Sequence, residues 1–483
     1  MEPREWLEHL IGRLRDRNQD VQKFDDYYSG RHPLLFTTSD FREAFGKMLD
    51  GYADNWCRII IDAAVERLTP TGFRFPTDTD DEQDDSGETA DDDAWQIWRA
   101  NKLDSRSQIA FVEAMVSGTA YLMVWYPEGT DIDDGQVILG DGAPRITVEH
   151  PSEVIVEHDP GDRDRRLAGL KMFGQHGYRR ATLFLPDRII RYQEGEVRDA
   201  HGHPVRDERG NVTYDWFPVD GESGPNPLGT VPIVPLVNRP RLLYPDGESE
   251  LQEIIPNQDA INKLAKDMLV ASEYGAFPQR WATGVEVPTD PETNEPIEDW
   301  IPDVSRFLTT ANPSARVGSL QAADLSNFVV ALDNRVNSMA SQSRTPPHYL
   351  NASADRLSGE SMKAAEAGLV ARVREKMIHF GEGIVEAMSL AFRIMGDPRG
   401  NIQDAVVLWA DPETRTEAAH ADAVVKKFEA RIIPWQVTVE DLGYSPTEIA
   451  RMRRMRQRET LEFGLGVELE DDDDEAVDLA TPA

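Results

Sequence analysis

Hydrophobic residues recur every three or four positions over the first 118 residues, which is the spacing of an amphipathic helix. This pattern predicts a helix over 7–28, a second over 55–68 and a helix pair over 94–118. Glycine or proline follows the first two segments and ends each helix. The chain therefore opens with a helical region.

The period then changes to two, which is the alternation of half-buried strands. Turn residues such as glycine, proline and aspartate separate the segments, so residues 119 to about 240 are predicted to be mainly β. The predicted strands are 121–126, 145–149, 153–157, 168–173, 180–185 and 188–192.

Helical spacing returns in three long segments. A helix over 249–272 is predicted to start at a capping box of Ser249 and Gln252, and a helix of matching length over 324–344 ends before two prolines. The short apolar alternations at 281–287 and 306–310 predict a small β insertion between these helices.

The third long helix is predicted from 358 to 395, about 52 Å. Because glycine is costly inside a helix, its several glycines predict bending or close approach to a neighbour. Prolines at expected first helical positions, such as Pro412, predict a small all-α domain over 411–465. The fold class is α+β.

Charge is distributed unevenly along the 483-residue chain, whose net charge is −36. Residues 78–93 hold 10 acidic residues and 468–478 hold 8, so these segments account for half of the imbalance. We interpret the first as a surface loop and the second, within 466–483, as a disordered acidic tail. A calcium site in the first is the less favoured alternative, because the spacing of an EF-hand loop is missing. The overall acidity argues against a general polyanion-binding surface.

The cysteine content and the hydropathy of the chain exclude several classes of protein. The single cysteine, Cys57, excludes an internal disulfide framework and multi-cysteine metal sites. The charged N-terminal residues do not resemble a signal peptide, and no apolar run is long enough to predict a membrane span. We expect a protein of a reducing compartment with no membrane association.

Motifs of catalysis are missing from the sequence. It contains no GxxxxGK[ST] loop, HExxH or GxSxG motif, and His201 and His203 fit an exposed Gly/Pro turn better than a metal site. We expect no enzyme activity, catalytic residue, metal or cofactor. An acidic metal-dependent hydrolase or nuclease, with a carboxylate pair among the 87 acidic residues, remains the alternative.

A basic cluster lies near the C-terminus. We interpret it as a solvated helix face that pairs with nearby acids, and contact with packed DNA is the second reading. The cluster comprises Arg451, Arg453, Arg454, Arg456 and Arg458.

Several segments, in a fixed order, resemble the portal proteins of tailed bacteriophages, specifically the family typified by the portal of the Bacillus phage SPP1. No one segment is specific alone, but their order covers most of residues 20–460. The segments are YYSGRHPL (27–34), NWCRIIIDAAVERLTPTGF (55–73), WQIWRANKLD (95–104), AMVSGTAYLMVW (114–125), PLGTVPIVPLVNRPR (227–241) and GESELQEIIPNQDAINKLAKDML (247–269).

The resemblance implies the phage portal fold: a mixed helical and β wing, a two-helix stem, a small β-containing clip, a long tunnel helix and an all-α crown. It implies a ring, usually of twelve subunits. By this resemblance the parts are the wing (1–245), stem (248–276 and 324–345), clip (277–323), tunnel loop (346–357), tunnel helix (358–395) and crown (396–465).

The resemblance also implies a role. The ring would occupy one capsid vertex of the virion, after assembly in the host cytoplasm, and pass double-stranded DNA during packaging and ejection. Its partners would be further copies of the chain, the major capsid protein, the terminase large subunit during packaging and a head-tail adaptor afterwards. ATP hydrolysis would belong to the terminase. Another phage head-neck adaptor is a further alternative.

A channel that lets DNA slide should make few phosphate contacts, because many contacts bind too tightly. Net acidity suits such a wall, and sparse contacts are expected around the tunnel loop. Packing against a neighbouring subunit is the alternative for these residues. The candidates are Arg344, His348, Tyr349, Asn351 and Arg356.

Overall fold

The computed structural model divides into two compact units, residues 1–412 and 413–483. The structure describes residues 1–33, 53–75, 91–133, 136–175, 178–276, 280–284, 313–319, 324–350, 359–401, 404–413, 417–442, 452–453 and 455–456. Most of the acidic segment 78–93 and all of the acidic tail lie outside these ranges.

The predicted N-terminal helices are confirmed. They are α1 (Pro3–Tyr28), α3 (Trp56–Val65), α4 (Asp92–Ala100) and α5 (Leu103–Ser117). Local signals set their ends: Asn55 accepts a hydrogen bond from the backbone of Arg58 at the start of α3, and Gly118 ends α5 with φ of 90°. The same conformation would strain any other residue at position 118, so the turn into the following strand depends on glycine.

The β region contains two main antiparallel sheets. A three-stranded sheet has the order β12-β2-β5, and a six-stranded sheet has the path β10-β9-β8-β7-β6, with β11 also paired to β9. All six predicted strands are present, although the structure extends several of them. The strands are β2 (Thr119–Trp125), β5 (Arg145–Glu149), β6 (Val154–His158), β7 (Arg166–Gln175), β8 (Tyr178–Phe184), β9 (Arg188–Glu196), β10 (Tyr214–Pro218), β11 (Gly224–Pro225) and β12 (Ile233–Val237), with the small hairpin β3 (Asp131–Asp133) and β4 (Gln136–Ile138).

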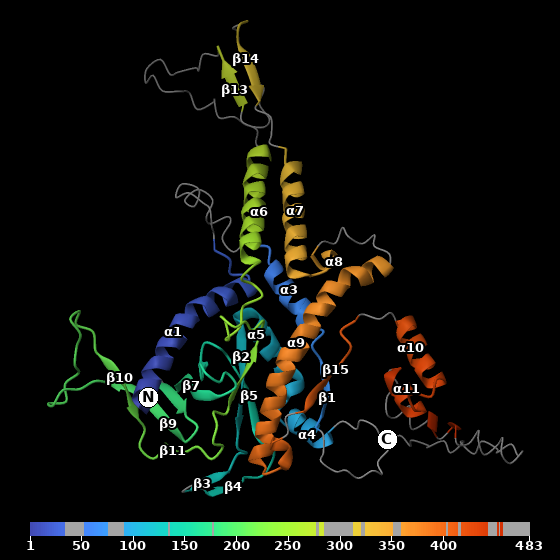
Figure 1. Ribbon diagram of the computed structural model, residues 1–483. Coiled ribbons are helices and arrows are strands. Elements are labelled where there is room, and N and C mark those ends of the chain that lie inside the picture. The colour runs from blue at the N-terminus through green and yellow to red at the C-terminus, as the bar shows by residue number, and fades with distance from the viewer. Residues whose placement is uncertain are drawn as a thin grey trace, which may run out of the picture. The chain divides into compact units, whose positions relative to one another are not determined.

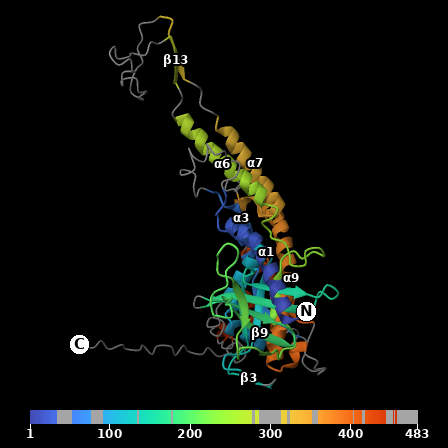
Figure 2. The same cartoon turned by 90° about the vertical axis from the view of Figure 1, so that its left-hand side faces the viewer.

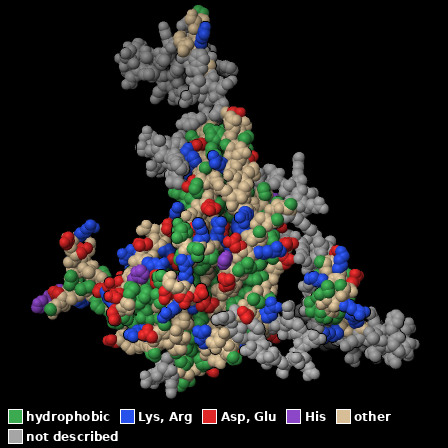
Figure 3. All heavy atoms as spheres, in the orientation of Figure 1, with side chains coloured by type: hydrophobic (Ala, Val, Ile, Leu, Met, Phe, Trp, Pro, Cys, Tyr) green, Lys and Arg blue, Asp and Glu red, His purple; other side chains and the backbone are tan. Residues whose placement is uncertain are grey.

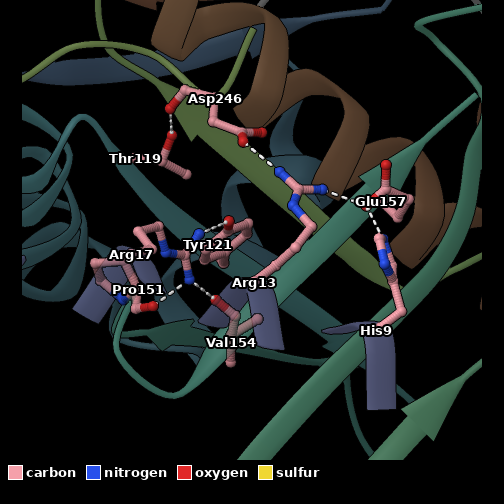
Figure 4. A network of polar contacts seen from close by, with 9 residues as sticks. All are labelled: His9, Arg13, Arg17, Thr119, Tyr121, Pro151, Val154, Glu157 and Asp246. Carbon is pink, nitrogen blue, oxygen red and sulfur yellow. Dashed lines mark hydrogen bonds and ion pairs between the residues drawn. The ribbon is translucent and has the colours of Figure 1, made fainter. Parts of the chain in front are cut away.

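Helix α1 packs on the six-stranded sheet and joins its two edge strands. Leu7, Leu10 and Leu14 are buried in one cluster with sheet side chains of β6 to β10. Arg4 donates to the carbonyl of Trp216 on β10 (2.6 Å), and Arg17 donates to the carbonyl of Val154 on β6 (Figure 4). These contacts satisfy carbonyl groups on edge strands, where unpaired backbone would favour aggregation.

The predicted helical hairpin with a β insertion is also present. Helices α6 (Ile255–Ala276) and α7 (Ser326–Ser343) lie side by side in both views, and β13 (Arg280–Thr283) pairs with β14 (Arg316–Ser319) in the segment between them (Figures 1 and 2). The predicted strand 306–310 lies outside the described residues.

The predicted start of the first hairpin helix is wrong by six residues. The helix begins at Ile255, and residues 250–254 form turns. The Ser249 hydroxyl donates to the carbonyl of Val116 and accepts from the backbone of Leu251, so it holds a turn against the end of α5 instead of capping a helix. Pro256 then lies in the first turn, where a helix tolerates proline.

Helix α9 (Gly359–Ile394) is the long helix that the sequence predicts, with 36 residues and a length of about 54 Å. Its apolar face forms much of the main core, in which Phe380 stacks on Phe111 with ring centroids 5.3 Å apart. Gly383 allows close approach to β12: a Cβ there would lie 2.7 Å from Leu236 Cδ2 and 3.0 Å from the carbonyl oxygen of Pro235. The prediction of a close approach at a glycine is confirmed.

The prediction of an all-α crown from 396 is corrected. After η3 (Pro398–Asn401), β15 (Val406–Trp409) pairs antiparallel with β1 (Pro70–Arg74), so residues up to Pro412 belong to the first unit. Pro412 starts no helix, and its carbonyl accepts a hydrogen bond from Arg67 (2.9 Å). The second unit contains α10 (Glu417–Glu429) and α11 (Trp435–Asp441) among its described residues.

Helix lengths and hydropathy also bear on membrane association. Among the residues that the structure describes, no helix combines the length and apolar character that a membrane span requires.

Candidate functional site: the end of the helix pair and the long helix

The candidate channel segment starts where α7 ends. Arg344 follows its last residue in the left-handed conformation, with φ of 53°, and its side chain is exposed. The short helix α8 (Pro347–Leu350) comes next and carries His348 and Tyr349. Asn351 and Arg356, the other two candidates, lie outside the described residues. The structure thus describes three of the five candidates.

Two of these three contact the body of the chain. The Tyr349 hydroxyl accepts a hydrogen bond from Arg67 (2.9 Å), which follows α3, and Arg67 also lies 3.4 Å from a carboxylate oxygen of Glu366 on α9. His348 Nε2 is 3.8 Å from the same oxygen, and its side chain is 15% exposed. Arg67 therefore ties α8 to α9, whereas Arg344 is the described candidate with an exposed side chain.

A buried arginine on α9 joins the same region to the helix pair. Arg372 is 4% exposed and donates to the carbonyl of Ser343, the last residue of α7, and to the carbonyl of Ile60 on α3 (2.7 Å). A cation beside the last carbonyl groups of α7 also complements the helix dipole. Burial lowers the pKa of Arg372, and the nearby Glu250 carboxylate counteracts this. One side chain thereby fixes the position of three helices.

An ion pair lies one turn further along α9. Lys376 is fully buried, and its Nζ lies 2.7 Å from a carboxylate oxygen of Glu250, in the turn before α6. Burial alone would raise the pKa of Glu250, but the charges of Arg372 and Lys376 outweigh it and hold that pKa below its usual value. Burial lowers the pKa of Lys376. A charge this deep is tolerated only when paired, so the pair fixes how α6 leaves the body.

Arg399 organises the other end of α9. Its guanidinium contacts both carboxylate oxygens of Asp91 (2.8 and 2.9 Å), and also Asp93 (3.0 Å) and Asp397 (2.7 Å). Asp91 also caps α4 by accepting from the backbone of Ala94 (2.9 Å). The last residues of the acidic segment 78–93 therefore have a structural role that the sequence does not reveal.

The C-terminal basic cluster is described only in part. Arg453 and Arg456 are exposed, and the Arg456 guanidinium lies 5.1 Å from the centre of the Trp435 ring. Arg451, Arg454 and Arg458 lie outside the described residues.

His201 and His203 are exposed in a turn in which Asp199 accepts from both of their backbone N–H groups, as their sequence context predicts.

The surrounding chemistry is that of a scaffold. Acidic and basic side chains are interspersed over the face in Figure 3 instead of forming one continuous basic track. Among the described residues, no three His, Cys, Asp or Glu side chains gather as a metal site would require. The buried charges described above bind backbone carbonyl groups and each other, so their role is to hold helices together.

The sequence reasoning missed Glu250, Arg372 and Lys376. A signal was present, because Arg372 and Lys376 follow Leu369 by three and seven residues and so fall on the apolar stripe of α9. Arg67 likewise continues the apolar spacing of α3. A cation within an apolar stripe indicates a buried charge with a partner, although the sequence does not identify that partner.

Comparisons with known proteins found relatives that align over most of the chain. The portal protein of Mycobacterium phage D29 is 31% identical over 481 residues, covering 95% of this chain and 90% of that protein. The portal protein of Mycobacterium phage L5 is 31% identical over 480 residues, covering 95% and 89%. A chain in the solved neck of a native gene transfer agent particle, computed with C12 symmetry, aligns over 86% of this chain and 94% of its own length, with 12% identity and a TM-score of 0.42.

The family match extends over almost the whole sequence. The sequence profile of the family described as "Phage portal protein, SPP1 Gp6-like" matches residues 7–460. That range includes most of α1, and all of the β region, the helix pair and α9. The chain belongs to the SPP1 Gp6-like family of phage portal proteins.

Proposed function

We propose that this portal protein assembles into a ring of twelve copies at one capsid vertex and forms the channel for DNA packaging and ejection. The observation that carries the proposal is the family match over residues 7–460. The paired helices α6 and α7, with a β hairpin between them in sequence, support it because such a pair can repeat around an axis. A metal-dependent hydrolase would need a metal site, and among the described residues no group of His, Cys, Asp or Glu side chains is arranged to hold a metal ion.

The parts of the chain take the following roles in this proposal. Residues 1–245 are the wing, and α6 and α7 form the stem. Residues 277–323 are the clip, which docks the terminase large subunit during packaging and the head-tail adaptor afterwards. Helix α9 is the tunnel helix behind the loop 346–357. The crown then starts after Pro412, because β15 belongs to the body.

The acidity of the chain fits passage of DNA. With twelve copies of a chain of net charge −36, the ring repels the phosphate backbone on average, so duplex DNA moves without tight binding. Arg344, His348, Tyr349, Asn351 and Arg356 are proposed as sparse contacts around the loop. The exposed Arg344 is the best supported of these, because His348 and Tyr349 have partners within their own chain.

The channel contacts can be tested by substitution. A double variant with His348→Ala and Arg356→Ala should assemble normally and package DNA less efficiently. Arg344→Ala is a second test of the same role. Because the Arg344 side chain is exposed, its loss should not disturb folding, so reduced packaging would report on contact with DNA. Packaging at the wild-type level in all these variants would contradict a role of the loop in DNA contact.

The partners and location follow from the same proposal. The ring is part of the virion, contacts the major capsid protein and is assembled in the host cytoplasm. The terminase supplies ATP hydrolysis, since the chain has no phosphate-binding loop motif. The purified ring should therefore show no ATPase activity, and turnover abolished by substitutions in this chain would contradict the proposal.

Native mass and negative-stain imaging test the ring directly. The expected result is a closed ring near twelve times 54.3 kDa with an open axial channel. A closed ring of thirteen would also support the portal role. A compact dimer with metal-dependent cleavage activity would instead favour the hydrolase.

A further inference from the structure

The loop after β12 carries two leucines that face solvent. Leu242 is 81% exposed and Leu243 is 82% exposed, the highest values among the large hydrophobic residues that the structure describes. They occupy the two central positions of a tight turn, in which Arg241 and Tyr244 exchange backbone hydrogen bonds (3.2 and 2.9 Å). We call residues 241–244 the leucine knob.

The knob is held rigidly at its base. The backbone carbonyl of Asn238 accepts a hydrogen bond from the backbone N–H of Glu248 (2.9 Å), and the Asn238 side chain donates to the Glu248 carbonyl (2.6 Å). Gly247 has φ of 83°, and a Cβ there would lie 2.3 Å from the Gly118 carbonyl oxygen. Arg241 also pairs with Glu248 at 3.2 Å. A preorganised loop loses little entropy when it binds, so its exposed leucines suit docking.

The same chain carries an apolar groove of a size that suits the knob. The groove has a volume of about 780 Å³ and lies along α9 beside β15, with Ile378, Val385 and Trp409 in its lining. Ile378 is 62% exposed, so the lining is open to a partner. Glu382 also lines the groove and is exposed, which complements the positive charge of Arg241 beside the leucines.

Knob and groove do not meet within one chain. Gly383 contacts β12, the strand that leads into the knob, whereas Val385 follows it by two residues, or about 200° around the helix. The groove therefore opens on the side of α9 that faces away from β12. Both leucines are highly exposed, which also shows that the knob does not contact the groove of its own chain.

We propose that the leucine knob of one subunit inserts into the α9 groove of the next copy of this chain. Two different, complementary surfaces on one chain form a heterologous contact, which generates a ring when the rotation closes. This inference rests on the proposed ring and specifies one contact that holds it together. The knob adds apolar burial to an acidic chain whose copies repel each other.

Cross-linking between engineered cysteines tests the contact. The native Cys57 is fully buried, so a short bismaleimide reports on introduced cysteines. The double variant with Leu243→Cys and Val385→Cys should give a ladder of covalent oligomers up to the full ring on a denaturing gel. The matched control pairs Leu243→Cys with Ile138→Cys, since Ile138 is 68% exposed on β4 and outside the groove. A ring of normal mass whose test pair gives no more ladder than the control would overturn the inference and leave the ring intact.

Substitution of the knob gives a second readout. The double variant with Leu242→Asp and Leu243→Asp should fold normally, because both side chains are exposed, and should raise the midpoint concentration for ring assembly at least about tenfold. Ile138→Asp is the control and should assemble at the wild-type concentration. Normal rings from the knob variant that fail to enter heads would show that another head protein occupies the knob, which contradicts the inference.

The wild type separates this inference from the function. If it forms no ring at any concentration, the proposed function fails at that step. Cross-linking of the same cysteine pair then shows independently whether knob and groove meet between copies, and its absence overturns the contact as well.

Discussion

Glu250, Arg372 and Lys376 place two buried cations around one buried carboxylate. Removal of one member of a buried pair leaves an uncompensated charge, which costs about 3–5 kcal/mol. Glu250→Gln leaves both cations without their counter-charge and should lower the free energy of unfolding by about that amount. Lys376→Met should destabilise the protein less, because the positive charge of Arg372 still stabilises the Glu250 carboxylate.

Denaturant unfolding followed by tryptophan fluorescence measures both variants. The double variant, Glu250→Gln with Lys376→Met, should be less destabilised than the sum of the two single changes, since each removes the other's unpaired charge. Equal losses for the two single variants, or simple additivity, would show that the three charges do not act as a unit.

Tyr349 and Arg344 are both candidate channel contacts, but their surroundings in the structure differ. Tyr349→Phe removes the hydroxyl that accepts from Arg67 and should lower stability by about 1 kcal/mol, whereas Arg344→Ala should leave the melting temperature unchanged. Differential scanning fluorimetry distinguishes the two. A stable Tyr349→Phe protein with impaired DNA packaging would instead assign the hydroxyl to the channel.

Arg399 also predicts a pH dependence. Its hydrogen bonds hold the pKa of Asp397 below the ordinary value of 3.8, so the unfolded state binds the proton more readily than the folded state. The resulting stabilisation is complete above the unfolded pKa, near 3.8, and is lost as the pH falls through the lower folded pKa. Arg399→Lys removes the bidentate contact to Asp397, made through Nε (3.0 Å) and a terminal guanidinium nitrogen (2.7 Å), and should lower the melting temperature at pH 7.

Melting temperatures from pH 7 down to pH 2 check this sign. The difference between wild type and Arg399→Lys should stay constant down to about pH 4 and shrink below it. Arg374→Lys, an arginine on α9 outside this cluster, is the control. A difference that grows as the pH falls would contradict the assignment.

At the scale of elements, sequence periodicity predicts long helices well because each buries one stripe of side chains. Helices α1 and α9 lie within a few residues of their predicted bounds. The pairing of β1 with β15 was not predictable in this way. More than 300 residues separate the two strands, and each strand depends on the other for its backbone hydrogen bonds, which periodicity within one segment does not reveal. The capping box at Ser249 failed because the hydroxyl has a tertiary partner, the Val116 carbonyl. For the candidate site, the sequence placed the segment between α7 and α9 but could not predict which way its side chains point. Tyr349 was expected to contact DNA, whereas its hydroxyl accepts a hydrogen bond from Arg67 of the same chain.

The glycines of α9 give a prediction for this element. Gly383→Ala should destabilise the protein, because its Cβ would lie 3.0 Å from the backbone oxygen of Pro235, and overpacking of this kind costs about 1–3 kcal/mol. Gly381→Ala is the matched control two residues earlier. Its Cβ would lie 3.6 Å from Trp409 Nε1, so the better helix propensity of alanine should stabilise it by up to about 1 kcal/mol. Thermal unfolding that ranks the two variants in the opposite order would contradict the close approach to β12.

At the scale of the whole molecule, assembly of the proposed ring would have to overcome the repulsion between copies that each carry a net charge of −36. Exposed charges interact over about 10 Å at 0.1 M ionic strength and over about 3 Å at 1 M, so added salt screens the repulsion between subunits. Apolar contacts such as the proposed knob and groove do not weaken under these conditions. The midpoint concentration for ring formation should therefore fall as sodium chloride rises from 0.1 to 1 M.

Mass photometry over a dilution series measures that midpoint. A variant in which the 8 acidic residues of 468–478 are changed to Asn or Gln should assemble at lower protein concentration in low salt and should respond less to added salt. Substitution of the uncharged residues of the same segment is the control. Rings that dissociate as salt is added would mean that attractive ion pairs between subunits dominate the interface, and the acidity of the chain would then need a different explanation from repulsion balanced by apolar contact.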